Sequence, residues 1–189
     1  MPAINLSDDK TVLLHTCCAP CSCAIIEQLL SEGIRPDLFF YNPNVHPFDE
    51  YLQRKASVIA YARKKKLDLI DADYDPETWL ALVKGFENEP ERGKRCSICF
   101  DIRLKKTAEY ASTHQYKLFA TTNGISRWKD MDQVNHSGRL AALPYSGLAF
   151  LDRNWRLDHA QAKASRITKE EQFHTQNYCG CIFSFRPGK

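Results

Sequence analysis

The sequence has no apolar run near the length of about 18 residues that a membrane-spanning helix needs. Its start, residues 1–10, has no basic stretch followed by an apolar one, so we expect no secretory signal and a cytoplasmic protein. Repeats and low-complexity linkers are also absent. Hydrophobic residues make up 43% of the 189 residues, which is enough for one packed core. We therefore expect a single domain of residues 1–189 with no membrane partner.

Glycine is missing where a nucleotide-binding enzyme would need it. The first expected strand, residues 11–16, is followed by the turn CCAPCS at residues 17–22. A loop that holds phosphates on its backbone N–H groups needs glycine at such a turn. This absence argues against ATP binding there.

Apolar runs alternate with segments of helical periodicity along the chain. Alternating strands and helices are typical of an α/β fold with a parallel sheet flanked by helices. Binding sites in such sheets form beyond the carboxyl ends of the strands, where the turns 17–23 and 122–126 are expected. We expect strands at 11–16, 38–41, 67–70 and 117–122, helices at 24–31, 48–66, 76–83, 96–114, 130–142 and 159–173, and a loop at 87–94.

Eight cysteines gather in three places. They are Cys17, Cys18, Cys21 and Cys23 after the first strand, Cys96 and Cys99 at a helix start, and Cys179 and Cys181 near the end. In a reducing compartment such groups bind metal or do redox work more often than they form structural disulfides. Cys96 and Cys99 share a helix face, since residues three apart are neighbours. A structural zinc needs four ligands on compact knuckles, whereas an iron–sulfur cube accepts four thiolates from scattered elements. The spacing favours iron–sulfur and leaves zinc open.

The pair Cys179-Gly180-Cys181 has a second interpretation. Two cysteines one residue apart can close a small, easily reduced disulfide ring, and Gly180 permits the required backbone torsions. The pair is therefore a candidate redox-active disulfide as well as a candidate ligand pair.

The residues above lie in five blocks that together resemble one family, the epoxyqueuosine reductases of the QueH type. The blocks span most of the chain and occur in the family's order. They are LLHTCCAPCS (13–22), FYNPNVHPFDEYLQR (40–54), ERGKRCSICFDIRL (91–104), TTNGISRWKDMDQVN (121–135) and YCGCIFS (178–184).

The resemblance implies an oxidoreductase that completes queuosine biosynthesis. Its members reduce the epoxide of epoxyqueuosine to the cyclopentene of queuosine at the wobble position of tRNA. The substrates implied are tRNAs with GUN anticodons, for aspartate, asparagine, histidine and tyrosine. The family's fold resembles the adenine nucleotide α-hydrolases (HUP-like), and its members use a [4Fe–4S] cluster and no cobalamin. An electron donor is required, which the sequence does not identify.

The same resemblance suggests roles for the cysteines. Cys17, Cys18, Cys96 and Cys99 match the cluster ligands, and Cys179 and Cys181 match the redox pair or the ligands of a neighbouring metal ion. Two electrons are needed and a cluster readily stores one. We hypothesise that Cys21, Cys179 and Cys181 surround a second centre, which is the dithiol or an additional mononuclear iron that polarises the epoxide oxygen. Cys23 matches nothing in the family and is expected to pack a helix.

Other residues give weaker signals. Asp101 and His46 are candidate catalytic residues, the first near the cysteines and the second in a loop, while His15 in the first strand is expected to be a core histidine. Stacking on a flipped-out wobble base needs aromatic rings, and contacts with tRNA phosphates need basic side chains, which outnumber acidic ones in the basic runs 92–106 and 153–189. The candidates are Tyr41, Trp128 and Tyr178 for stacking, and Arg92, Lys94, Arg95, Arg127 and Lys129 for phosphates.

Two alternatives are retained. A tRNA sulfur-transfer enzyme that uses ATP would share the expected fold, but it needs the phosphate loop that the turn at 17–22 lacks. A zinc-stabilised tRNA-binding module would explain the basic runs, but it leaves thiols without a role.

Overall fold

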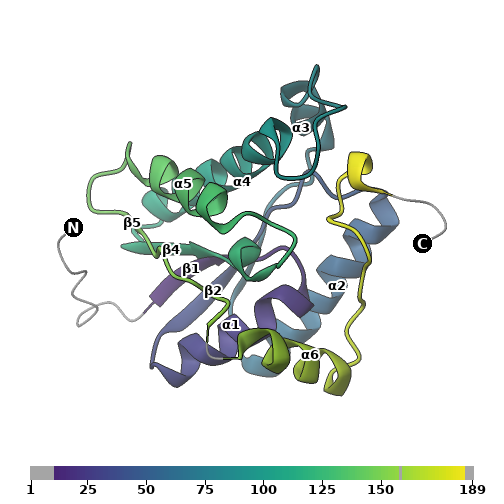
Figure 1. Ribbon diagram of the computed structural model, residues 1–189. Helices are drawn as coiled ribbons and strands as arrows, with labels where there is room; N and C mark the ends of the chain where they lie inside the picture. The colour runs from purple at the N-terminus through teal and green to yellow at the C-terminus, as the bar shows by residue number, and fades with distance from the viewer. Residues whose placement is uncertain (1–10, 158, 186–189) are drawn as a thin grey trace.

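A parallel sheet of five strands runs through the molecule in the order β3-β2-β1-β4-β5, with helices on both faces (Figure 1). This computed structural model describes residues 11–157 and 159–185, so the ends of the expected domain 1–189 lie outside the described residues. The strands are β1 (Thr11–His15), β2 (Arg35–Phe40), β3 (Leu69–Asp71), β4 (Leu118–Thr121) and β5 (Ala149–Phe150). The helices are α1 (Ala19–Ser31), α2 (Phe48–Lys65), α3 (Pro76–Leu82), α4 (Lys94–Thr113), α5 (Met131–Ala142) and α6 (Ala160–Glu170), with short 3-10 helices η1 (Thr122–Ile125) and η2 (Ile182–Ser184).

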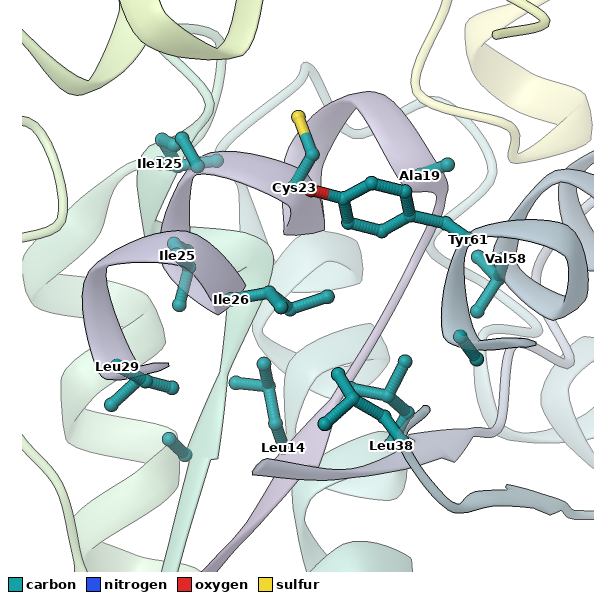
Figure 2. Close-up of a cluster of buried hydrophobic side chains, with 14 of the residues drawn as sticks. Leu14, Ala19, Cys23, Ile25, Ile26, Leu29, Leu38, Val58, Tyr61 and Ile125 are labelled. Atoms are coloured by element: carbon teal, nitrogen blue, oxygen red, sulfur yellow. The ribbon is translucent and has the colours of Figure 1, made fainter. Parts of the chain in front are cut away.

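The central strand β1 separates two apolar layers because successive side chains of a strand point to opposite faces. Val12 and Leu14 pack with residues of α1, α2 and α6, and Figure 2 shows this face around α1. Leu13 packs on the other face, with residues of α4 and α5. Burial on both faces explains the continuous apolar run of β1, and it confirms the predicted α/β class with a parallel sheet.

The carboxyl end of β1 is the point where the order of the sheet reverses. Its neighbours are β2 on one side and β4 on the other, and His15 is opposite both Phe39 and Thr121. Ligand sites of open α/β sheets form at such a switch point. Here it is flanked by the Cys17-Cys18 turn and by η1. The narrower prediction of a HUP-like fold stays a prediction.

Two local predictions are corrected. The helix expected at 24–31 begins at Ala19, with Pro20 in its first turn, so Cys21 and Cys23 are helical and the turn is shorter than residues 17–23. Proline suits this position because its missing N–H has no helical partner there. Strand β5 was missed because it has only two residues, too few for a periodic signal. The other element ends differ from the prediction by a few residues.

Two further expectations can be compared with the described residues. None of their helices combines the length and apolarity needed to cross a bilayer. Cys23 is fully buried in the apolar layer around α1, as expected of a packing thiol (Figure 2).

Candidate metal centre

Three cysteines lie together where β1 ends and α1 begins. The sulfurs of Cys17, Cys18 and Cys21 are all within 4.8 Å of one another. The Sγ atoms of Cys17 and Cys18 are 3.8 Å apart. Two sulfur ligands of one tetrahedral ion, with metal–sulfur bonds of about 2.3 Å, also lie about 3.8 Å apart. The sulfurs of Cys17 and Cys18 therefore have the spacing of two ligands on one ion. To bind two different irons of a cluster, the two side chains would have to turn apart.

Four of the other five cysteines form a second group, which leaves out Cys23. Cys99 and Cys181 pack with Trp79 and Val83 in one buried cluster, although 82 residues separate the two cysteines. Burial raises the pKa of the Cys96 thiol, and the nearby thiols of Cys179 and Cys181 raise it further. The structure therefore brings together the helix pair and the Cys179-Gly180-Cys181 segment. All eight cysteines are free thiols.

Charge in the first group is concentrated on Cys17. Hydrogen bonds from Cys18 and Cys21 hold the pKa of Cys17 well below 9.0, with help from the positive charges of Lys129 and Arg103. The same hydrogen bond raises the pKa of Cys18 to about 12. Burial raises the pKa of Cys99 to about 11. Cys17 is therefore the thiol of this group that loses its proton most readily, and metal binding must displace the protons of the others.

Three cations lie close enough to the cysteines to affect their titration. They are Arg54, Arg103 and Lys129. Arg54 pairs with Glu50, but neither Arg103 nor Lys129 belongs to an ion pair within the described residues. A buried charge is costly unless an opposite charge is near. The surplus positive charge therefore favours an anionic, sulfur-rich group at this point.

Three buried donors at the site also lack a partner within the described residues: Nη2 of Arg54, Nδ2 of Asn123 and Nε1 of Trp79. Asn123 lies next to the first group, since its Oδ1 accepts from Lys129 at 2.8 Å and from Arg103 at 3.2 Å. Cluster sulfurs accept hydrogen bonds, and such bonds tune the reduction potential. The free donors and the donor set of thiols both fit an iron–sulfur cluster.

A network of buried polar side chains lies next to the first group of cysteines. Arg103 is 2% exposed and donates to Asn42 Oδ1 at 2.7 Å and to His15 Nε2 at 3.3 Å. Nδ1 of His15 lies 2.9 Å from Thr121 Oγ1. His15 is fully buried and bonded, which confirms that it is a core histidine. The network ties β1, β2, β4 and α4 together directly beneath the cysteine turn.

Comparison with known proteins decides the family. Residues 12–187 match the family model described as epoxyqueuosine reductase QueH. The chain belongs to the epoxyqueuosine reductase QueH family. A relative with that name from Haemophilus influenzae is 49% identical over 93% of this chain and 71% of its own length. One from Acinetobacter baylyi is 47% identical over 93% and 80%, and one from Thermotoga maritima is 33% identical over 92% and 90%. Membership disfavours both the sulfur-transfer and the zinc-module alternatives.

The candidate tRNA contacts of this QueH family member lie in different settings. Trp128 is 64% exposed, and the guanidinium of Arg127 lies 4.8 Å from its ring centroid. Arg92 is exposed and donates to the carbonyls of both residues, each at 3.0 Å, so the loops 91–94 and 126–130 form one surface. Lys94 is exposed beside them. These four residues form an exposed basic and aromatic surface.

Other candidates point inward. Arg95 is 3% exposed and donates to the carbonyls of Phe86 and Glu87, which gives it a structural role. Lys129 bonds Asn123 within the site. Tyr41 is buried in the layer of α4 and α5. Burial and these bonds leave the three side chains less available to tRNA.

The candidates Asp101, His46 and Tyr178 are near the cysteines in sequence or in space. Asp101 is half-buried on α4. The side chain of His46 is exposed, but its backbone N–H donates to Gly180 O at 2.7 Å and its carbonyl accepts from the Tyr178 hydroxyl. Tyr178 and the His46 backbone thus hold the Cys179-Gly180-Cys181 segment, while the roles proposed from the sequence stay predictions.

Sequence reasoning missed several polar residues of the site. They are Asn42, Glu50, Arg54, Arg103, Asn123, His174 and Gln176. One signal was available, because Glu50 and Arg54 are spaced to pair on a helix face and lie within a family block. Arg103 lies among five other basic residues between Arg92 and Lys106, and only the three-dimensional structure shows that it is buried.

Proposed function

We propose that this protein reduces epoxyqueuosine to queuosine on tRNA by means of a [4Fe–4S] cluster, without cobalamin. The observation that carries the proposal is the gathering of seven cysteines into two groups, the first at the switch point of the sheet and both close enough to Lys129 to affect its titration, in a chain that belongs to the QueH family. We assign the cluster to Cys17, Cys18, Cys96 and Cys99. Cys179 and Cys181, together with Cys21, form the redox pair or hold an additional mononuclear iron.

The electron balance supports a second centre. Conversion of the epoxide to an alkene consumes two electrons and two protons and releases water. When bound, the cluster supplies electrons one at a time. Oxidation of the Cys179 and Cys181 thiols to a disulfide releases two electrons and two protons, which matches the demand. An external electron donor must then reduce the pair again, and the protein is expected in the reducing cytoplasm, where such donors occur.

The chain's own residues prepare this site for an anionic group. Arg103 and Lys129 offset negative charge on the sulfurs, and Trp79 and Val83 keep water away from Cys99 and Cys181. Exclusion of water strengthens electrostatic interactions inside the site. We assign tRNA binding to the surface of Arg92, Lys94, Arg127 and Trp128, with GUN anticodons as the specificity.

The proposal is tested on anaerobically purified protein with epoxyqueuosine-containing tRNA. Iron, acid-labile sulfide and zinc are measured per chain. About four irons with matching sulfide support the cluster, and one further iron supports the mononuclear site. One or two zincs without sulfide contradict the proposal and favour a zinc-stabilised RNA-binding protein.

Single cysteine variants separate the two roles. Cys179→Ser is expected to abolish turnover and to leave the cluster absorbance largely intact. Cys99→Ser is expected to lose both. Cys23→Ala is the matched control, since this thiol packs in the apolar layer and is expected to keep both. Full turnover by Cys179→Ser contradicts the role given to the dithiol.

A further inference from the structure

The segment that carries Cys179 and Cys181 lies along α2 after the chain leaves α6, as Figure 1 shows in yellow beside blue. One side chain of α2, that of Arg54, contacts the segment at the cysteine pair itself. Nη1 of Arg54 donates to the Cys179 carbonyl at 3.1 Å, and its guanidinium carbon lies 5.6 Å from the centroid of the Tyr178 ring. Arg54 therefore touches the segment at two successive residues.

The approach of Gly180 to Arg54 is closer than any other residue would allow. A Cβ at position 180 would lie 2.7 Å from Nη1 of Arg54, and Gly180 has a φ of +109°. Residues with a side chain rarely adopt this backbone conformation. The absence of a side chain at position 180 thus permits the close contact between the segment and the guanidinium of Arg54.

Arg54 is itself held in place from the outside. Its Nε donates to Glu50 Oε1 at 2.6 Å, and the other carboxylate oxygen of Glu50 lies 2.8 Å from His174 Nε2. The side chain of Arg54 is 2% exposed and that of Glu50 11% exposed. A buried pair with short, charge-assisted hydrogen bonds has a well-defined geometry. Glu50 therefore fixes the guanidinium independently of its bond to the Cys179 carbonyl.

The remaining donor of Arg54 belongs to the cysteine site. Nη2 is buried and has no partner within the described residues. Burial opposes the charge of Arg54, but Cys18 and Glu50 outweigh it and raise its pKa. Gln176 Nε2 donates to Cys18 Sγ at 3.3 Å, so the same segment also reaches the first cysteine group. Arg54 lies between the two groups of thiols.

We propose that Arg54 is a positioning residue that holds the Cys179-Gly180-Cys181 segment against the Cys17-Cys18 turn and presents its free Nη2 hydrogens to sulfur at the site. Glu50 and His174 orient the guanidinium. The proposal that Arg54 positions the segment rests only on the contacts described above. Its consequence for turnover rests on the proposed function.

Thiol alkylation measures the positioning directly. Reduced, anaerobically purified protein is treated with iodoacetamide, quenched at intervals and digested with trypsin. Cleavage after Lys169 gives a peptide whose only cysteines are Cys179 and Cys181. The alkylation rate of these two cysteines is therefore measured separately from that of the other cysteines. The wild-type protein is compared with Arg54→Met, Arg54→Lys and Gly180→Ala. Arg63→Met is the matched control, since Arg63 is an exposed arginine of the same helix.

Loss of the charged hydrogen bond is expected to raise the alkylation rate of this peptide about tenfold in Arg54→Met, since the segment opens more often. Gly180→Ala leaves the guanidinium intact but pushes the segment away, and a similar rise is expected. Arg54→Lys keeps the charge without the planar fork and is expected to fall between Arg54→Met and the wild type. Arg63→Met is expected to behave as the wild type.

Turnover gives a second result that a general loss of structure does not produce. Because Arg54 is buried, its loss is expected to lower kcat and to leave the KM for tRNA unchanged, with partial recovery in Arg54→Lys. Wild-type alkylation rates in a folded Arg54→Met protein overturn the proposal. Should that variant not fold, a wild-type rate in Gly180→Ala overturns it instead. Absence of turnover in the wild-type protein contradicts the proposed function but not the positioning, which the alkylation rates decide.

Discussion

Replacement of the buried Arg103 by methionine tests the polar network beneath the cysteine turn. Methionine retains most of the apolar stem but removes all three hydrogen bonds of the guanidinium. Asn123 Oδ1 keeps its bond from Lys129. His15 Nε2, which lies 3.1 Å from the Tyr41 carbonyl, is free to carry the proton and donate to that carbonyl once Arg103 no longer donates to it. Asn42 Oδ1, on a fully buried residue, is the acceptor that loses a 2.7 Å bond.

The magnitude follows from this inventory. One unsatisfied buried acceptor costs about 1–3 kcal/mol, and the relief of a buried charge offsets the loss of the two longer bonds. We expect the free energy of unfolding to fall by about 2 kcal/mol. With a denaturant slope of about 2 kcal/mol/M, the urea midpoint falls by about 1 M.

The assay is anaerobic urea unfolding followed by circular dichroism, with midpoints compared between variants because a metalloprotein need not unfold in two states. Lys105→Met is the control, since Lys105 is an exposed base on the same helix. Its midpoint is expected to remain at the wild-type value. Equal midpoints for Arg103→Met and Lys105→Met refute the reasoning, because the network would then contribute nothing to stability.

Three further predictions follow from packing, titration and the exposed surface. In Gly138→Ala the new Cβ would lie 2.5 Å from the ring of Phe150. The cost of overpacking is expected to exceed the gain in helix propensity, so the free energy of unfolding falls by about 1 kcal/mol. Adding Phe150→Leu to the same chain is expected to restore stability, and thermal melts of the single and double variants check this. Burial, and then the hydrogen bond to Glu27, raise the pKa of Tyr61. Tyr61 therefore ionises at lower pH in the unfolded chain than in the folded one, and stability is lost as the pH rises above 10.0. Above that pH the urea midpoint of Tyr61→Phe is expected to fall less steeply than that of the wild type, and parallel curves would contradict this. Trp128→Ala is expected to raise the KM for tRNA about tenfold with kcat unchanged, whereas Trp128→Phe keeps a stacking face and most of the affinity; an unchanged KM in the alanine variant removes Trp128 from the tRNA surface.

The sequence was sufficient for the fold class and for the location of the site. Continuous apolar strands and periodic helices specify a parallel sheet, and the turns that follow its strands are expected at one edge of that sheet. The order of the strands, with β4 beside β1, comes from the structure. Cys17 and Thr122 do meet, since the Cys17 N–H donates to Thr122 Oγ1 at 3.3 Å. The pairing of β4 with β1 brings these two residues together across 105 residues of sequence.

The polar residues that complete the site were not predictable in the same way. Charge in a sequence window does not distinguish an arginine on the surface from one inside, and Arg103 and Lys105 are two residues apart with opposite burial. The two residues differ in burial because they lie on different faces of α4, and which face is buried can be decided only when the elements that pack against α4 are known. The grouping of Cys99 with Cys181 depends in the same way on the return of the chain along α2.

The turn after β1 determines which ligand atoms the switch point of this parallel sheet offers. Glycines at this turn would expose backbone N–H groups to phosphate, but here the turn presents thiols, and Thr122 Oγ1 accepts from the Cys17 N–H. Arg103 and Lys129 retain the positive character that such a switch point offers to anions. The same location therefore attracts negative charge, and the ligands that it offers are sulfurs. The C-terminal segment, fixed by Arg54 and Gly180, then supplies two further thiols that the sheet itself cannot provide.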